Sequence, residues 1–319
     1  MSILVTGGAG FIGSHLIDRL LKETDEQIIC FDNFNDYYDP SRKRANVSAF
    51  KDESRVTLVE ADFCDSEVAL RVFDQHGVSS VVHLGAYAGV RYSVEHPEIY
   101  QKANVCGTVN LLEAARRHPV NRFLAASSST VYGAGAKAPF VEDAPLGTPL
   151  SPYGASKRAA ELLCETYHCL HQVPVVSFRL FSVYGPRLRP DLAMTIFTGK
   201  ILSGQTLPLY GDGTIRRDFT HVDDICTGLI TALTKNGLVG HAINLGHDEP
   251  IEIRQLIELL EKYCGKKAHI DRQPEKPGDM PLTHADLNKA KRLLKYKPKM
   301  PIDEGIKQYV EWFREHAGE

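Results

Sequence analysis

The feature that most limits the fold of this chain is a set of three spaced glycines near its N-terminus. Gly7, Gly10 and Gly13 stand between an apolar strand pattern at residues 3–6 and a helical pattern at residues 11–21. The first glycine permits a tight turn, the second lets the backbone approach a phosphate, and the third lets the helix pack closely on the strand. The helix N-terminus then offers unpaired N–H groups and a positive dipole end to a diphosphate. The pattern predicts a dinucleotide-binding turn, with a purely structural tight turn as the alternative.

The rest of the first half alternates short apolar runs with helical patterns. Such alternation predicts a parallel sheet that is covered by helices on both faces. After residue 184, glycines and prolines divide the chain into loops and short elements before further helical patterns follow. The strand patterns are 3–6, 27–31, 56–60, 80–84, 122–126, 175–180 and 241–245, and the helical patterns are 11–21, 105–117, 156–170, 225–233, 253–263, 286–294 and 301–314.

These patterns indicate an α/β protein with a Rossmann-type, doubly wound parallel sheet. Residues 1–180, together with about 220–247, should form the dinucleotide-binding domain. Residues 181–219 and 248–319 should form a smaller, interleaved C-terminal lobe for the substrate. We find no repeat and no low-complexity linker, so the lobe should be interleaved rather than tethered.

Composition argues against several other classes of protein. The net charge of −3 over 319 residues gives no general reason to expect nucleic acid or an anionic membrane as a partner. No apolar run reaches the roughly 18–20 residues that cross a bilayer, and the N-terminus lacks the pattern of a signal peptide. The seven cysteines form no Cys-x-x-Cys pair and support neither a zinc site nor a disulfide framework. We therefore expect a cytoplasmic protein with reduced thiols and no metal site.

Acidic residues after the second and third strand patterns complete the predicted dinucleotide site. Asp32 stands where a carboxylate can accept hydrogen bonds from the adenosine ribose hydroxyls and would repel a 2′-phosphate, which favours NAD over NADP. Asp62 could bond the adenine amino group or cap the following helix, and the sequence leaves both roles open. The other residues that we expect to line the cofactor are Phe11, Ile12, Asn33, Phe63 and Asn104.

A second motif places a tyrosine and a lysine one helical turn apart. Residues 153–157 read Tyr-Gly-Ala-Ser-Lys, and positions i and i+4 share a helix face, so Lys157 should lie beside Tyr153. Lys157 and a positive nicotinamide ring would lower the pKa of the phenol, ordinarily about 10, and make Tyr153 a general base near neutral pH. Ser128 could bond the same substrate hydroxyl. Taken alone the pair could be a surface contact, but together with the glycine motif it favours catalysis.

These motifs resemble the extended short-chain dehydrogenase/reductases that modify nucleotide sugars. The resemblance runs essentially end to end and includes residues 216–224 and the Pro-Gly-Asp triplet at 277–279. It implies oxidation of carbon 4 of a UDP-sugar and a 4-keto intermediate beside NADH. Dehydratases of this branch carry Asp-Glu where this chain has Ser129 and Thr130, and UDP-glucuronate decarboxylases carry Glu in place of Thr130. What remains is a redox-neutral 4-epimerase.

The substrate is suggested by three segments that resemble the UDP-glucuronate 4-epimerases, namely residues 31–44, 88–92 and 189–193. UDP-glucose 4-epimerases usually carry Asn where this chain has Ser182, and a small hydroxyl residue leaves room and a donor for a carboxylate. If these segments only shape loops, UDP-glucose/UDP-galactose epimerisation is the alternative. A 4-ketouronate loses carbon dioxide readily. Neutral donors such as Ser127, Ser128 and Ser182 could hold its carboxylate out of line with the ketone orbitals.

The resemblance also implies where the UDP moiety binds. Arg217 would bond the diphosphate, its alternative being a surface ion pair with Asp218, and Asp279 would hold the uridine ribose. Lys276 stands where the family usually has Arg, so it supplies charge without the bidentate fork. Arg189 could reach the sugar or the phosphates. The remaining expected substrate contacts are Arg91 and Ser129.

Two other functions fit the same fold. A non-catalytic NAD-binding regulator would not need an intact Ser128, Tyr153 and Lys157, and a net nucleotide-sugar dehydrogenase would have to exchange its cofactor. The resemblance further implies a homodimer, in which residues 104–117 and 152–170 of two copies pair around a two-fold axis. Alternatively, these helices only cover the sheet.

Overall fold

The central sheet is parallel throughout and contains every strand that the sequence predicts. The computed structural model describes residues 2–274 and 280–316. Its seven strands have the order β11-β6-β5-β4-β1-β2-β3, so the winding reverses between β1 and β4. Ligands of doubly wound sheets bind at such a switch point, outside the carboxyl ends of the strands. The strands are β1 (Ser2–Thr6), β2 (Gln27–Asp32), β3 (Val56–Glu60), β4 (Ser80–His83), β5 (Arg122–Ser128), β6 (Val175–Leu180) and β11 (Ala242–Leu245).

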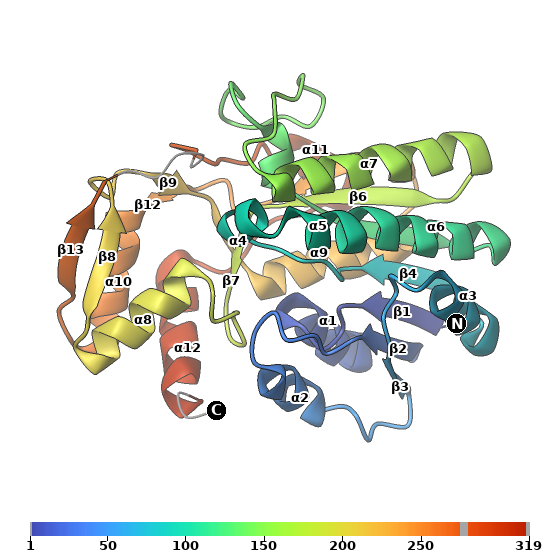
Figure 1. Ribbon diagram of the computed structural model, residues 1–319, viewed down its shortest axis with the longest axis horizontal. Coiled ribbons are helices and arrows are strands. Elements are labelled where there is room, and N and C mark those ends of the chain that lie inside the picture. Colours follow the sequence, from blue (N-terminus) through green and yellow to red (C-terminus); the bar gives the residue numbers. More distant parts are fainter. Residues whose placement is uncertain (1, 275–279, 317–319) are drawn as a thin grey trace.

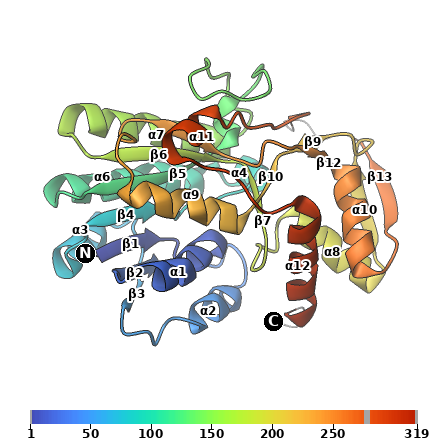
Figure 2. The same ribbon diagram turned by 180° about the vertical axis from the view of Figure 1, so that it is seen from behind.

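Helices cover both faces of this sheet (Figures 1 and 2). On one face, α3, α6 and α7 contribute Phe73, Leu111 and Cys164 to one apolar cluster. On the other, α1 and α9 contribute Leu16 and Ile225 to a second cluster. The apolar stripe of each helix packs on the continuous apolar strands, and the predicted Rossmann-type fold is confirmed. The helices are α1 (Phe11–Glu23), α2 (Pro40–Ser48), α3 (Ser66–His76), α6 (Gly107–Arg117), α7 (Pro152–His171) and α9 (Val222–Thr234).

The helix that the sequence predicts at 105–117 begins earlier and contains an irregular turn. After α4 (Val90–Glu95), α5 (Pro97–Tyr100) runs into a π-helical turn at Gln101–Cys106, which continues as α6. Such π turns are frequent at functional sites. Here the turn contains Asn104, which is buried.

The second lobe holds more regular structure than the sequence predicts. Strands β8 (Thr206–Tyr210) and β13 (His269–Gln273) pair in parallel, beside α8 (Ala193–Ser203), α10 (Ile253–Cys264) and α12 (Ile302–Glu315) at the left of Figure 1. Only loops and short elements were predicted around α8. This segment has low intrinsic helix propensity because it contains Gly199 and β-branched residues, so the sequence does not predict a helix there. Packing against α10 stabilises the helix.

Segments that are far apart in the chain meet between the large sheet and the smaller β8–β13 pair. Two short strand pairs bring distant segments together: β7 (Ser182–Tyr184) pairs with β10 (Phe219–His221), and β9 (Arg216–Arg217) pairs with β12 (Ile251–Glu252), which joins residues before and after the return to the sheet. The chain then returns to the sheet through α9 and β11. Helix α11 (Asn288–Leu294) lies in the stretch predicted to belong to the substrate lobe, yet it packs on β11 and α9. Among the described helices, we find none with the length and apolarity to cross a membrane.

Candidate active site

The glycine turn between β1 and α1 is packed too closely for side chains at Gly7 and Gly13. Gly7 has φ +66°, and a Cβ there would lie 2.8 Å from Gly85 Cα. A Cβ at Gly13 would overlap the carbonyl oxygen of Gly7. Helix α1 begins at Phe11 with Gly10 as its N-cap, so no capping side chain covers its first N–H groups. The turn therefore fits the diphosphate of a dinucleotide.

Asp32 ties this turn to the end of β2. Its carboxylate is buried and accepts hydrogen bonds from the backbone N–H groups of Ala9 (3.2 Å) and Phe34 (2.9 Å). A cation that was not predicted from the sequence lies beside it: Lys43 Nζ is 3.4 Å from Asp32 Oδ1 and donates to Asn35 Oδ1 at 3.1 Å. Lys43 belongs to α2, a polar helix without a clear apolar stripe that the hydrophobic pattern does not reveal.

Asp62 does not cap helix α3. Helix α3 is capped by Asp65, whose carboxylate accepts from Glu67 N at 2.9 Å and Val68 N at 3.2 Å. Asp62 Oδ1 accepts from Cys64 N at 2.8 Å. The capping alternative for Asp62 is therefore wrong, and the hypothesis of an adenine contact remains. Of the other predicted cofactor residues, Phe63 is buried against Phe31 and His83, Ile12 is half-buried on α1, and Asn33 accepts from Asn35 N.

Asn104 in the π turn is committed to protein groups. Its amide exchanges two hydrogen bonds of 2.9 Å with the backbone of Tyr87, and Nδ2 also donates to Ser156 Oγ at 3.0 Å. It thereby ties the loop after β4 to α7. Since Ser156 precedes Lys157, Asn104 helps to fix the start of α7.

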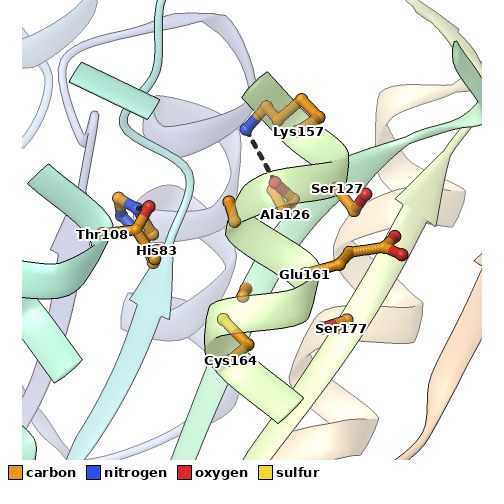
Figure 3. Close-up of a pocket in the computed structure, with 10 residues that line it drawn as sticks. His83, Thr108, Ala126, Ser127, Lys157, Glu161, Cys164 and Ser177 are labelled. Carbon is orange, nitrogen blue, oxygen red and sulfur yellow. Dashed lines mark hydrogen bonds between the residues drawn. The ribbon is translucent and has the colours of Figure 1, made fainter. Parts of the chain in front are cut away.

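The start of α7 brings together the three predicted catalytic residues. Ser151 caps the helix by accepting from Gly154 N at 3.1 Å, which places Tyr153 in the first turn and Lys157 one turn later. Lys157 Nζ donates to Ala126 O at 2.8 Å (Figure 3). Ser128, at the end of β5, faces Tyr153 closely enough to act on its pKa.

Thr130 supports Ser128 from the short 3₁₀ turn at Ser129–Tyr132. Thr130 N (3.2 Å) and Thr130 Oγ1 (3.0 Å) both donate to Ser128 Oγ. These bonds occupy the acceptor side of Ser128 and leave its hydroxyl proton to be donated to the Tyr153 oxygen. Sequence reasoning considered Thr130 only as the place of a missing Glu; its position in the serine-rich run was the available signal.

The charge near Tyr153 differs from the expectation. Burial raises the pKa of the Tyr153 phenol, while the Ser128 hydroxyl and then the Arg189 guanidinium counteract this. Burial lowers the pKa of Lys157 to about 8. The expected lowering of the Tyr153 pKa by Lys157 is not seen, because the lysine ammonium is directed at a backbone carbonyl. Arg189, which the sequence linked only to the substrate, is the cation that acts on Tyr153.

Ser127 lies beneath α7 and not with the other serines. It pairs in register with Arg179, whose guanidinium donates to Glu161 of α7 (Nε to Oε1, 3.0 Å), so both side chains lie on the α7 face. The hydroxyl oxygen of Ser127 is buried and has no hydrogen-bond partner among the described residues. It lines a cavity of ≈ 10 Å³, about the size of one water molecule. Figure 3 shows the lining, which includes His83, Thr108, Lys157, Glu161, Cys164 and Ser177.

The predicted substrate residues of the second lobe surround β7 and β9. Ser182 begins β7, and its N–H donates to Asp218 O at 3.0 Å. Arg217 Nη1 donates to Met280 O at 2.6 Å. The proposed alternative, an ion pair between Arg217 and Asp218, is wrong, because Asp218 is buried and accepts from the backbone N–H groups of His247, Asp248 and Ala285.

Four further residues were predicted to bind the substrate. Arg91 lies 4.8 Å from the ring centroid of Tyr210, so a residue of α4 contacts β8 of the second lobe. Ser129 is buried in the 3₁₀ turn. Lys276 and Asp279 lie outside the described residues.

The comparisons with known proteins agree with this geometry. Residues 3–246 match the model of the NAD dependent epimerase/dehydratase family. A UDP-glucuronate 4-epimerase of Thermodesulfobacterium geofontis is 41% identical over 314 residues, covering 98% of this chain and 96% of that protein. The structure of UDP-glucuronic acid 4-epimerase from Bacillus cereus, in complex with UDP-glucuronic acid and NAD, matches with a TM-score of 0.94 at 36% identity, covering 99% of this chain and 100% of that chain.

A UDP-glucose 4-epimerase of Thermotoga maritima with UDP-glucose matches less well, with a TM-score of 0.89 at 32% identity, covering 99% of this chain and 100% of that chain. The resemblance to the extended short-chain dehydrogenase/reductases is thus confirmed over nearly the whole chain. The family model spans more than half of the sequence. The chain therefore belongs to the NAD dependent epimerase/dehydratase family.

Proposed function

We propose that the protein is an NAD-dependent UDP-sugar 4-epimerase that converts UDP-glucuronate to UDP-galacturonate. The observation that carries this proposal is the arrangement of Thr130, Ser128 and Tyr153. A hydroxyl that supports Ser128 stands where decarboxylases and dehydratases of this branch carry a carboxylate. The relatives named as UDP-glucuronate 4-epimerases support the same substrate.

The cofactor would lie across the switch point of the sheet. The diphosphate would lie on the turn formed by Gly7, Gly10 and Gly13. Asp32 would accept hydrogen bonds from the adenosine ribose hydroxyls, and Asp62 would accept one from the adenine amino group. We infer that residues 1–180 and about 220–247 bind NAD, and that residues 181–219 and 248–319 form the lobe that binds the UDP-sugar. Helix α11 lies within this second lobe in the sequence but packs on the sheet. NAD, when bound, would supply the redox chemistry by serving as acceptor and then donor of the hydride at carbon 4.

The chain's own residues would move the proton. Tyr153 takes the proton of the 4-hydroxyl as a phenolate, and Ser128 stabilises this phenolate by donating its hydroxyl proton to the Tyr153 oxygen. Arg189 lowers the cost of the phenolate charge, and the positive nicotinamide ring would add to its effect. After the 4-keto sugar has rotated, Tyr153 returns its proton to the other epimer. Ser129 and Ser182 would hold the carboxylate with neutral hydrogen bonds, and Arg217 the diphosphate.

The direct test is incubation of the purified protein with UDP-glucuronate and, separately, with UDP-glucose, followed by NMR of the products. We expect UDP-galacturonate to form faster than UDP-galactose. Faster turnover of UDP-glucose would favour the alternative epimerase instead. NADH released in proportion to product would indicate a net dehydrogenase, and no turnover of either sugar would indicate a binding protein.

We further propose a cytoplasmic homodimer built on α6 and α7. These helices lie side by side (Figure 1), and Leu162 and Leu170 on α7 are 54% and 69% exposed. All seven cysteines are free, as the cytoplasm would keep them. Sedimentation of the wild type and of Leu162→Glu tests the dimer: we expect a dimer that the charge disrupts, and a monomeric wild type would contradict it.

A further inference from the structure

The guanidinium next to the catalytic tyrosine is already paired with a carboxylate of its own loop. Arg189 Nε donates to Asp191 Oδ1 at 2.9 Å, and Arg189 Nη2 donates to Asp191 Oδ2 at 2.8 Å. Both side chains are largely buried, with 19% and 32% of their surface exposed. A bidentate pair of this kind fixes the plane of the guanidinium as well as balancing its charge.

Tyr37 holds the pair from a second segment of the chain. Its ring centroid lies 5.6 Å from Arg189 Cζ, and its hydroxyl lies 3.3 Å from Asp191 Oδ2 and 2.6 Å from Ala88 O. A Cβ at Gly89 would lie only 2.8 Å from Tyr37 Oη, so the loop after β4 is closely packed on the tyrosine.

Tyr100 connects this arrangement to the catalytic residue. Its hydroxyl donates to the carbonyls of Ala88 (3.1 Å) or Gly89 (3.0 Å), and its ring packs edge-on against Tyr153 at 6.0 Å. Segments that follow β2, β4 and β7 therefore meet around one ion pair at the general base. Arg189 and Tyr153 are close enough that each shifts the pKa of the other.

This arrangement matters because the proposed 4-keto intermediate is a β-keto acid. In decarboxylation the C5–C6 bond breaks, its electron pair enters the C4 carbonyl, and carbon dioxide leaves an enolate. C5 then takes a proton from water, and the resulting 4-ketopentose is reduced with the NADH already formed, giving a UDP-pentose. A free cation beside Tyr153, which holds the C4 oxygen, would stabilise the enolate and attract the carboxylate.

We propose that Asp191, held by Tyr37, is a specificity-determining positioning residue: it fixes Arg189 in place and reduces its effective positive charge, so that the 4-keto intermediate keeps its carboxylate and is epimerised. This inference rests on the proposed UDP-glucuronate function. Asp191 acts through Arg189 and does not touch the reacting atoms. The carboxylate of the substrate is left to neutral hydroxyl donors.

The test is Asp191→Asn, which keeps the shape of the side chain and removes its charge. Purified wild type and variant are incubated with UDP-glucuronate, and the ratio of UDP-pentose to UDP-galacturonate is measured by NMR. The absorbance of bound NADH provides a spectroscopic readout. Loss of one charge-assisted pair should raise this ratio about tenfold. Tyr37→Phe should raise it less, and it provides a second test if Asp191→Asn folds poorly.

Two further variants separate this role from a structural one. Asp18→Asn removes a comparable ion pair, with Arg187 of the same loop (2.7 Å), and should leave the ratio unchanged. In an Arg189→Ala background, Asp191→Asn should have no further effect on the ratio, since Asp191 acts through Arg189. An active wild type whose ratio is unchanged by both Asp191→Asn and Tyr37→Phe overturns this inference alone. A wild type that does not epimerise UDP-glucuronate overturns the proposed function itself.

Discussion

The pH dependence of Ser128→Ala tests the assignment of the general base most directly. Tyr153 acts as a phenolate, and its pKa is raised by burial and pulled down first by the Ser128 hydroxyl. A hydrogen bond to a charged group contributes about 1.5–3 kcal/mol, and one pKa unit corresponds to about 1.4 kcal/mol. Removing the donor should therefore raise the pKa of Tyr153 by about one to two units. Because the base is active when deprotonated, the rising limb of kcat/KM should move to higher pH by the same amount.

The assay is kcat/KM for UDP-glucuronate across the pH range in which the protein stays folded. At neutral pH the variant should be about 10 to 100 times slower, and it should recover part of this loss as the pH rises. Thr130→Val removes the hydroxyl that donates to Ser128 Oγ at 3.0 Å. It should also move the rising limb of kcat/KM to higher pH, but by a smaller amount. If kcat/KM of Ser128→Ala is lower at every pH but its rising limb stays at the same pH as in the wild type, Ser128 does not stabilise the phenolate.

Three further predictions concern the base, the cofactor and the sugar pocket. Tyr153→Phe should lower kcat by about 100-fold or more while calorimetry shows nearly unchanged UDP-sugar binding; near wild-type turnover would exclude Tyr153 as the base. Replacing Asp32 with Ala should raise affinity for NADP in a fluorescence titration, because Lys43 at 3.4 Å loses its carboxylate and can meet a 2′-phosphate; an unchanged preference would show that Asp32 does not face the ribose. Ser182→Asn should weaken UDP-glucuronate more than UDP-glucose in steady-state kinetics, since the larger amide fills the space of the carboxylate, and equal effects on both would contradict that view of the pocket.

Residues that are close in the sequence were predicted well. The glycine turn, the strands and the Tyr153–Lys157 spacing depend on local geometry, and the structure has each of them. Helices α2, α3 and α8 were not predicted. Helix α3 does carry an apolar pattern, since Ala69, Val72 and Phe73 form its buried face. The sequences of α2 and α8 lack a clear apolar stripe or favourable helix propensity, so these helices depend on tertiary packing. Ser127 was misplaced for a related reason: alternation along β5 and the register with β6 decide its direction, and the register is not visible in one strand.

Contacts between distant segments set the charge at the general base, and these were the least predictable. The helical spacing brings Lys157 next to Tyr153, yet the lysine donates to Ala126 O, and the cation that acts on the phenol comes from the loop after β7. That cation is in turn balanced by Asp191. The Tyr–Lys spacing therefore provides the general base, while the loops around it determine how much positive charge the base and the C4 oxygen experience. Changes in these loops could redirect the 4-keto intermediate without altering the catalytic helix, which is why the product ratio, and not the rate alone, is the quantity that the Asp191 variants must change.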